Sequence, residues 1–129
     1  MASPNNLYYT NEHEWVSVDG DIATIGITDH AQSELGEIVY VEVETVGESL
    51  AKDEVFGTVE AVKTTSDLYL PVSGEIIEFN SELDESDGDN PELINNDPYG
   101  KGWIIKVKMS ETSEVASLMS AEEYENLIS

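Results

Sequence analysis

The sequence contains no cysteine and no arginine, and it offers few groups suited to catalysis. Without cysteine the chain can form no disulfide, no thiolate metal site and no cysteine nucleophile. The two histidines, His13 and His30, are too few and too separated in sequence to predict a metal site. There is also no glycine-rich phosphate loop, and no serine lies in a nucleophile-elbow context. We therefore expect no catalytic residue, no bound metal and a non-enzymatic protein.

Basic residues are scarce, with five lysines against 28 acidic residues and a formal net charge of -23. Such an acidic surface repels phosphate backbones and anionic lipids, so we expect neither nucleic acid nor membrane as a partner. The acidity is open to three explanations, namely solubility, steering toward basic partner surfaces, and adaptation to salt.

Long apolar runs are absent as well, and none approaches membrane-spanning length. Residues 1–4 lack the basic and apolar regions of a secretion signal and the Arg-rich character of an organelle transit peptide. We expect a cytoplasmic protein, or a mitochondrial one only if a leader has been removed.

What the chain does contain is a series of short β-branched and apolar segments separated by turn residues. Asp19-Gly20 predicts a two-residue hairpin loop, and Thr28 predicts the N-cap of a short helix that Gly36 ends. The predicted strands cover residues 13–18, 21–27, 38–43, 55–60, 66–70, 75–79 and 103–109. A helical turn is expected at residues 91–94, and the capping-box pattern at Ser120 predicts a C-terminal helix through about Leu127.

These patterns predict one mainly β domain over residues 1–129, a small sandwich or barrel with a short internal helix and a C-terminal helix. Residues 80–90 form an acidic stretch without an apolar anchor after Leu83, and we expect a solvated, mobile loop there.

Lys63 lies between two of the predicted strands, at the point where the hairpin should reverse. A lysine at such a tip has its ammonium group in water, where an enzyme can reach it and acylate it without unfolding the chain. A turn lysine more often serves only to keep a turn soluble, so its position alone does not decide between the two roles.

The residues around Lys63, Glu60-Ala61-Val62-Lys63-Thr64-Thr65-Ser66-Asp67, resemble the lipoylation motif of glycine cleavage H proteins. Further blocks resemble the same family in the same order, and they span most of the chain. They include His13-Glu14-Trp15-Val16, Ile25-Gly26-Ile27-Thr28-Asp29-His30, Pro71-Val72-Ser73-Gly74 and Pro98-Tyr99-Gly100-Lys101-Gly102-Trp103. The acidic stretch at residues 84–89 departs from the family by its length and charge.

The resemblance implies a barrel-sandwich hybrid of two small antiparallel sheets that carries lipoate as an amide on Lys63. It implies a carrier that moves an aminomethyl group from glycine decarboxylase (P protein) to an aminomethyltransferase (T protein). Dihydrolipoyl dehydrogenase (L protein) would reoxidise the arm, and a lipoate ligase or lipoyl synthase would install it. We expect the carrier to be a monomer.

The resemblance also implies roles for other residues. Glu60 matches a position that the lipoylating enzyme recognises. Glu14 and Asp67 match positions in the cleft that receives the loaded arm. Gly57 is included among these cofactor-site residues, although we expect it and Gly74 to serve backbone geometry at a bend or bulge. For Glu14, Glu60 and Asp67 plain solvation is an equal alternative, and for Asp67 turn capping is another. His13 and Trp15 are expected to pack, and His30 to lie at the surface.

Two other carriers have to be considered. The first is a lipoyl domain, or a lipoate relay, of a 2-oxoacid dehydrogenase, which usually has Asp-Lys-Ala at the tip followed by a Pro/Ala-rich linker. The second is a biotin carrier, which flanks its lysine with methionines. Val62 and Thr64 fit neither pattern.

Overall fold

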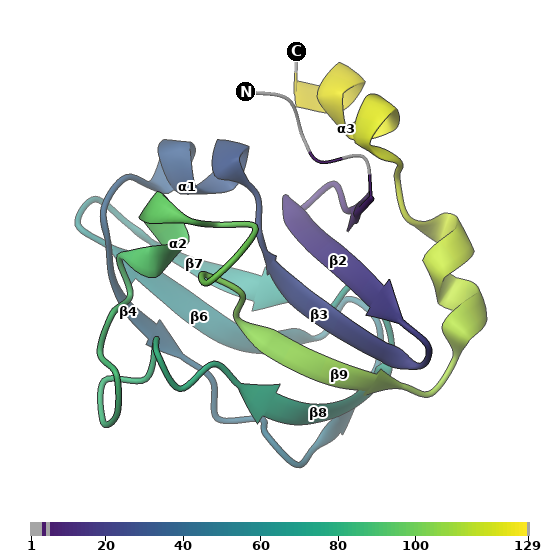
Figure 1. Cartoon of the computed structure of the whole chain (residues 1–129), viewed down its shortest axis with the longest axis horizontal. Coiled ribbons are helices and arrows are strands. Elements are labelled where there is room, and N and C mark those ends of the chain that lie inside the picture. Colours follow the sequence, from purple (N-terminus) through teal and green to yellow (C-terminus); the bar gives the residue numbers. More distant parts are fainter. Residues whose placement is uncertain (1–3, 5, 129) are drawn as a thin grey trace.

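The computed structural model describes residue 4 and residues 6–128, and residues 1–3 of the N-terminal segment considered above lie outside this part. Two antiparallel sheets lie one over the other (Figure 1). The larger sheet has the strand order β1-β2-β3-β9-β8-β5 and the smaller one β4-β6-β7. The strands are β1 (Tyr8–Tyr9), β2 (Glu14–Asp19), β3 (Ile22–Ile27), β4 (Ile38–Glu42), β5 (Ser49–Leu50), β6 (Val55–Ala61), β7 (Thr65–Tyr69), β8 (Gly74–Phe79) and β9 (Ile105–Met109). The helices are α1 (Asp29–Leu35), α2 (Leu93–Asn96), the 3-10 helix η1 (Thr112–Ser117) and α3 (Ala121–Ile128).

The main core fills the space between the two sheets. Alternate residues of the strands point inward, as for Ile105 and Val107 on β9, while Lys106 and Lys108 point outward. Ile25, Ile76 and Val107 of the larger sheet belong to the same buried cluster as Val59 and Leu68 of the smaller one. Each such side chain contributes about 1.5–3 kcal/mol when it leaves water, so this layer holds the two sheets together.

The predicted fold class, mainly β with two antiparallel sheets and a C-terminal helix, is confirmed. Helix α1 begins and ends as predicted, because Thr28 accepts a hydrogen bond from the Ala31 amide and Gly36 adopts a positive φ of 83°. The capping box is also present, since Ser120 and Glu123 each accept a hydrogen bond from the other's backbone amide.

Several predicted boundaries were wrong by one or two residues, and the last strand, predicted from residue 103, begins at Ile105. Asp19 pairs with Ile22, so the hairpin loop is Gly20-Asp21, with Gly20 at a positive φ of 64°. The helical turn predicted at residues 91–94 begins later, as α2, because Pro91 lies in the preceding turn and no side chain caps the helix. Strands β1 and β5, of two residues each, were missed because two residues show no periodicity.

The acidic stretch at residues 80–90 forms a series of turns anchored by Leu83, which is buried. The Gly88 amide donates to the Ser81 carbonyl and the Asn90 amide to the Glu82 carbonyl. The loop is therefore bonded to itself, and its carboxylates face water.

A second buried cluster attaches the C-terminal helix to the larger sheet. It consists of Leu7, Tyr9, Trp15, Ala121 and Tyr124. The rings of Tyr9 and Tyr124 stack with centroids 4.9 Å apart, and Tyr9 and Met119 exchange two backbone hydrogen bonds. Strand β1, near the start of the described chain, and helix α3, near its end, thus hold each other in place on one side of the molecule.

Gly57 lies where β6 passes very close to β4. A Cβ atom at this position would lie 2.5 Å from the Glu42 carbonyl oxygen and 2.9 Å from Val43 Cγ2. We therefore expect Gly57→Ala to reduce the free energy of unfolding by about 1–3 kcal/mol, because the backbone must shift to accept the methyl group. Urea unfolding measures the change, and the exposed Asp87→Ala should cost less than about 0.5 kcal/mol. An alanine variant as stable as the wild type would contradict this close contact.

Candidate functional site

Lys63 lies at the tip of the hairpin that joins β6 to β7, and its side chain is exposed. The Ala61 amide donates to the Thr64 carbonyl at 2.7 Å, which closes the hairpin. The Val62 amide donates to the Glu37 carbonyl at 3.0 Å, which fixes the tip to the segment after α1. The hairpin thus presents its lysine from a backbone that is bonded on both sides.

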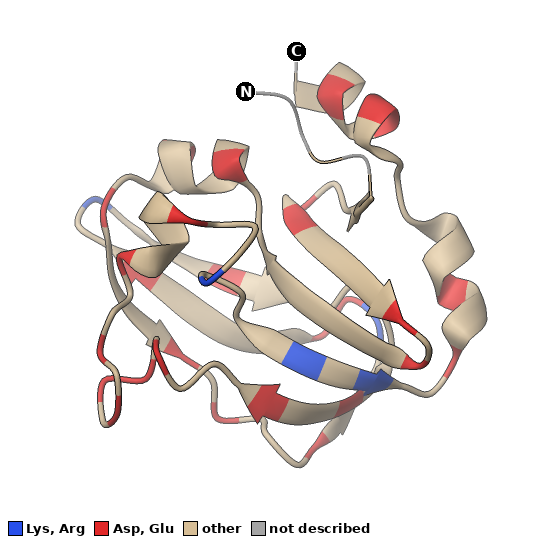
Figure 2. Ribbon diagram, in the orientation of Figure 1, with Lys and Arg blue, Asp and Glu red and all other residues tan. Residues whose placement is uncertain are grey.

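No ion pair holds Lys63 to any residue that the structure describes. Its stem lies over Gly36, where a Cβ atom would come within 2.9 Å of Lys63 Cε. Figure 2 shows acidic residues on most loops and strands, and a basic segment at the tip of this hairpin. Lys63 is therefore a reachable amine, neither buried nor held by a carboxylate.

A cleft of about 290 Å³ opens between helix α1 and strands β6 and β7. Its floor is apolar, formed by Ile27, Ala31, Leu35, Val59 and Leu68. Its polar lining comes from the loop before β2 and from β2, α1 and β7. These polar residues are Glu12, His13, Glu14, His30, Glu34, Ser66 and Asp67. Since Leu35 and Ser66 are close in sequence to Gly36 and Lys63, the cleft extends to the neighbourhood of the hairpin tip. A long, partly apolar group attached to Lys63 could lie in it.

Glu14 is the most buried acidic residue of this lining, with 2% of its surface exposed. The Thr10 hydroxyl donates to Oε1 at 2.7 Å and the Tyr69 amide to Oε2 at 3.2 Å. Burial raises the pKa of the Glu14 carboxyl to about 8, even though both hydrogen bonds favour the ionised form. At neutral pH the carboxyl is therefore mainly protonated, and a cation that enters the cleft would favour its ionisation.

The cleft brings together two of the predicted site residues and leaves out two others. Glu14 and Asp67 both line it, Glu14 buried and Asp67 exposed. Glu60 is exposed on β6 and lies opposite Tyr40 and Thr65, outside the cleft lining. Gly57 was placed among the cofactor-site residues, but it lines a separate shallow hollow with Glu42 and Glu44. At Gly57 strand β6 comes so close to the Glu42 carbonyl of β4 that a Cβ atom would lie 2.5 Å from its oxygen.

A sequence model of the family described as glycine cleavage H-protein matches residues 7–129. The chain belongs to this family. The H protein of Bacteroides thetaiotaomicron is 56% identical over 128 residues, which cover 99% of this chain and 98% of the relative. That of Halalkalibacterium halodurans is 57% identical over 126 residues, 98% of this chain and 95% of the relative. The crystal structure of an H protein from Mycobacterium marinum is similar with a TM-score of 0.84 and 37% identity, covering 96% of this chain and 97% of that one.

The predicted resemblance and the predicted carrier role in the glycine cleavage system are thereby confirmed. As an H protein, the chain is a carrier component that works with the P, T and L components of that system. Within residue 4 and residues 6–128, no helix is both long enough and apolar enough to span a membrane.

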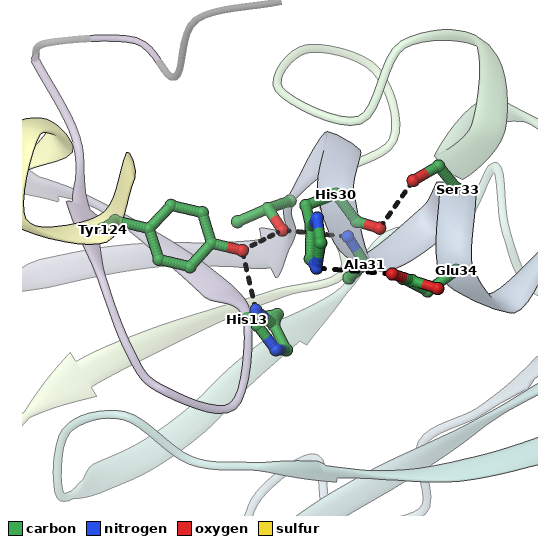
Figure 3. A network of polar contacts seen from close by, with 7 residues as sticks. His13, His30, Ala31, Ser33, Glu34 and Tyr124 are labelled. Atoms are coloured by element: carbon green, nitrogen blue, oxygen red, sulfur yellow. Dashed lines mark hydrogen bonds and ion pairs between the residues drawn. The ribbon is translucent and has the colours of Figure 1, made fainter. Parts of the chain in front are cut away.

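The H-protein cleft also contains two histidines that were not predicted to belong to the site. The ring centroids of His13 and His30 are 5.0 Å apart. His30 Nε2 is 3.7 Å from Glu34 Oε1 (Figure 3). Sequence could have paired His30 with Glu34, which are one helical turn apart on α1. It offered no signal for His13, because this residue precedes β2 and meets His30 only in the folded chain.

Proposed function

We propose that this H protein carries lipoate in amide linkage to the ε-nitrogen of Lys63. The observation that carries the proposal is an exposed lysine on a hydrogen-bonded hairpin beside a cleft, in a chain of the H-protein family. No described carboxylate forms an ion pair with this lysine. The hairpin keeps the amine accessible to a lipoate ligase, and the folded body stays intact during modification.

The residues near Lys63 fit such a group. Gly36 leaves room for the lysine stem, and the apolar floor of the cleft suits an aliphatic chain. When bound, lipoate supplies the disulfide and dithiol chemistry that accepts and releases the aminomethyl group. The protein contributes position, since a tethered arm reaches a docked partner at a high effective concentration.

We further propose that Glu14 and Asp67 receive the loaded end of the arm in the cleft. A cationic amine would find Glu12, Glu34 and Asp67 along the lining and the buried Glu14 carboxyl at its side. Ionisation of Glu14 against such a cation would hold it by a charge-assisted hydrogen bond, out of bulk water. The H protein itself would perform no catalysis, because the chemistry belongs to the arm and to the partner enzymes.

Glu60 is proposed as a contact for the lipoylating enzyme, because it is exposed and lies three residues before Lys63 in the sequence. We propose that the glycine decarboxylase, the aminomethyltransferase and the dihydrolipoyl dehydrogenase each bind at the hairpin.

We propose a monomer in which residues 1–129 act as one carrier domain. From its bacterial relatives we propose a cytoplasmic location.

Reconstitution tests this function directly. The lipoylated chain is added to glycine decarboxylase with carboxyl-labelled glycine, and the release of labelled CO₂ is followed. Release of labelled CO₂ should depend on the added chain and saturate with its concentration.

The alternative function is that of a lipoyl domain or lipoate relay for 2-oxoacid dehydrogenases. Activity with such a dehydrogenase, together with none in the glycine assay, would establish that alternative instead.

A further inference from the structure

The wall of the cleft is connected to the C-terminal helix by a short chain of hydrogen bonds (Figure 3). The hydroxyl of Tyr124, on α3, lies 2.8 Å from His13 Nδ1 and 2.7 Å from Thr28 Oγ1. Thr28 Oγ1 in turn accepts the Ala31 amide at the start of α1. Three segments that are distant in sequence thus meet at one tyrosine hydroxyl.

The direction of these hydrogen bonds follows from counting protons. Tyr124 and Thr28 each have one hydroxyl hydrogen, and Thr28 Oγ1 already accepts from Ala31. If Thr28 donates to Tyr124 and Tyr124 donates to His13 Nδ1, both hydrogens are used within the chain. If His13 donated instead, Tyr124 would donate to Thr28, and the Thr28 hydroxyl hydrogen would have no acceptor among the residues that the structure describes. The first arrangement uses every donor and is favoured.

The charges around His13 are consistent with that arrangement. Burial, followed by the neighbouring His30, lowers the pKa of His13, which favours the neutral imidazole. The negative charges of Glu12 and Glu34 raise the pKa of His13 by a smaller amount. Glu14 lies beside them in the cleft lining. Burial raises the pKa of Tyr124 to about 12, so its hydroxyl keeps the hydrogen that it donates.

We propose that Tyr124 is a positioning residue of the arm cleft, which fixes His13 as a neutral imidazole with Nδ1 as acceptor and Nε2–H as a donor to the cleft. Nε2 points away from Tyr124 (Figure 3), and His13 is part of the cleft lining. The ligand for this donor is a hydrogen-bond acceptor on the arm, such as its amide carbonyl. The inference rests on the proposed function of the cleft. It makes the C-terminal helix, through Tyr124, a part of the site.

The decisive variant is Tyr124→Phe, which keeps the ring stacked on Tyr9 and removes only the hydroxyl. Long-range ¹H–¹⁵N NMR of the unlipoylated chain should show His13 as the Nε2–H tautomer in the wild type. In Tyr124→Phe we expect a mixture of the two neutral tautomers and a higher titration midpoint of His13, because the neutral imidazole loses the hydrogen bond that Nδ1 accepts. The exposed Tyr8→Phe should leave both properties unchanged.

A second measurement follows the lipoylated, aminomethyl-loaded protein. Its hydrolysis consumes water and gives formaldehyde, ammonia and the free thiol. Release of formaldehyde should be about tenfold faster in Tyr124→Phe, as for the loss of one hydrogen bond. Tyr8→Phe should match the wild type.

His13→Asn provides the second variant, in case Tyr124→Phe does not fold. Asparagine tolerates the positive φ of 68° at this position, and its carbonyl can still accept from Tyr124. It lacks the Nε2–H donor, so release should be as fast as in Tyr124→Phe while the C-terminal helix stays in place.

A wild-type His13 that carries its proton on Nδ1, or is charged at pH 7, would overturn the inference. So would unchanged tautomer and release rate in Tyr124→Phe. Failure of the chain to accept lipoate would instead overturn the proposed function, and the tautomer measurement, which needs no lipoate, would still decide the hydrogen-bond chain.

Discussion

Lys63→Arg should abolish lipoylation of this protein. After incubation with lipoate ligase, lipoate and ATP, the intact mass of the wild type should rise by one lipoyl group, and that of the variant should not change. Arginine keeps the positive charge and nearly the length of lysine, but its guanidinium stays protonated and does not form the amide. Because the side chain is exposed, the free energy of unfolding should change by less than about 0.5 kcal/mol.

Lys101→Arg is the matched control, since Lys101 is also exposed in a turn. It should be lipoylated to the same extent as the wild type. Equal labelling of Lys63→Arg and wild type would show that the arm is attached elsewhere. An unmodified wild type would remove the carrier assignment for Lys63 altogether.

Glu14→Gln should remove a large part of the pH dependence of stability. The pKa of Glu14 is about 8 in the folded protein and near 4.5 when the side chain is in water, so between these values the folded state binds one more proton. The contribution of Glu14 to stability is therefore full below about pH 4.5 and is lost as the pH rises through about 8. Glutamine resembles the protonated carboxyl and does not titrate, so this loss is absent in the variant.

Denaturant unfolding from pH 4.5 to pH 9 measures the effect. Relative to Glu14→Gln, the wild type should become less stable by roughly 4 kcal/mol over this interval. The repulsion among the other acidic residues affects both proteins and cancels in the difference. Glu48→Gln, an exposed residue outside the cleft, should keep the pH dependence of the wild type. A difference between wild type and Glu14→Gln that stays constant with pH would show that Glu14 is ionised in the folded protein.

The sequence alone determined the features that depend on neighbours along the chain. Thr28 and Gly36 predicted both ends of α1, because capping and a positive φ involve residues within one turn. Ser120 with Glu123 predicted the start of α3 for the same reason. The strands on each side of Lys63 placed it at a hairpin tip, and the blocks that resemble H proteins gave the family.

Only the tertiary structure decided how the cleft is built and what charge its residues carry. The pKa of Glu14 depends on burial under segments that are distant in sequence, and burial is not encoded in a local pattern. His13 and Tyr124 stand near opposite ends of the chain and meet because Tyr9, Trp15 and Ala121 pack around Tyr124. The need for glycine at position 57 also could not be predicted from its neighbours in sequence. It follows from the close approach of the Glu42 carbonyl on another strand. Local sequence specifies turns and caps, whereas the contacts that make the site form only when the two sheets and the C-terminal helix come together.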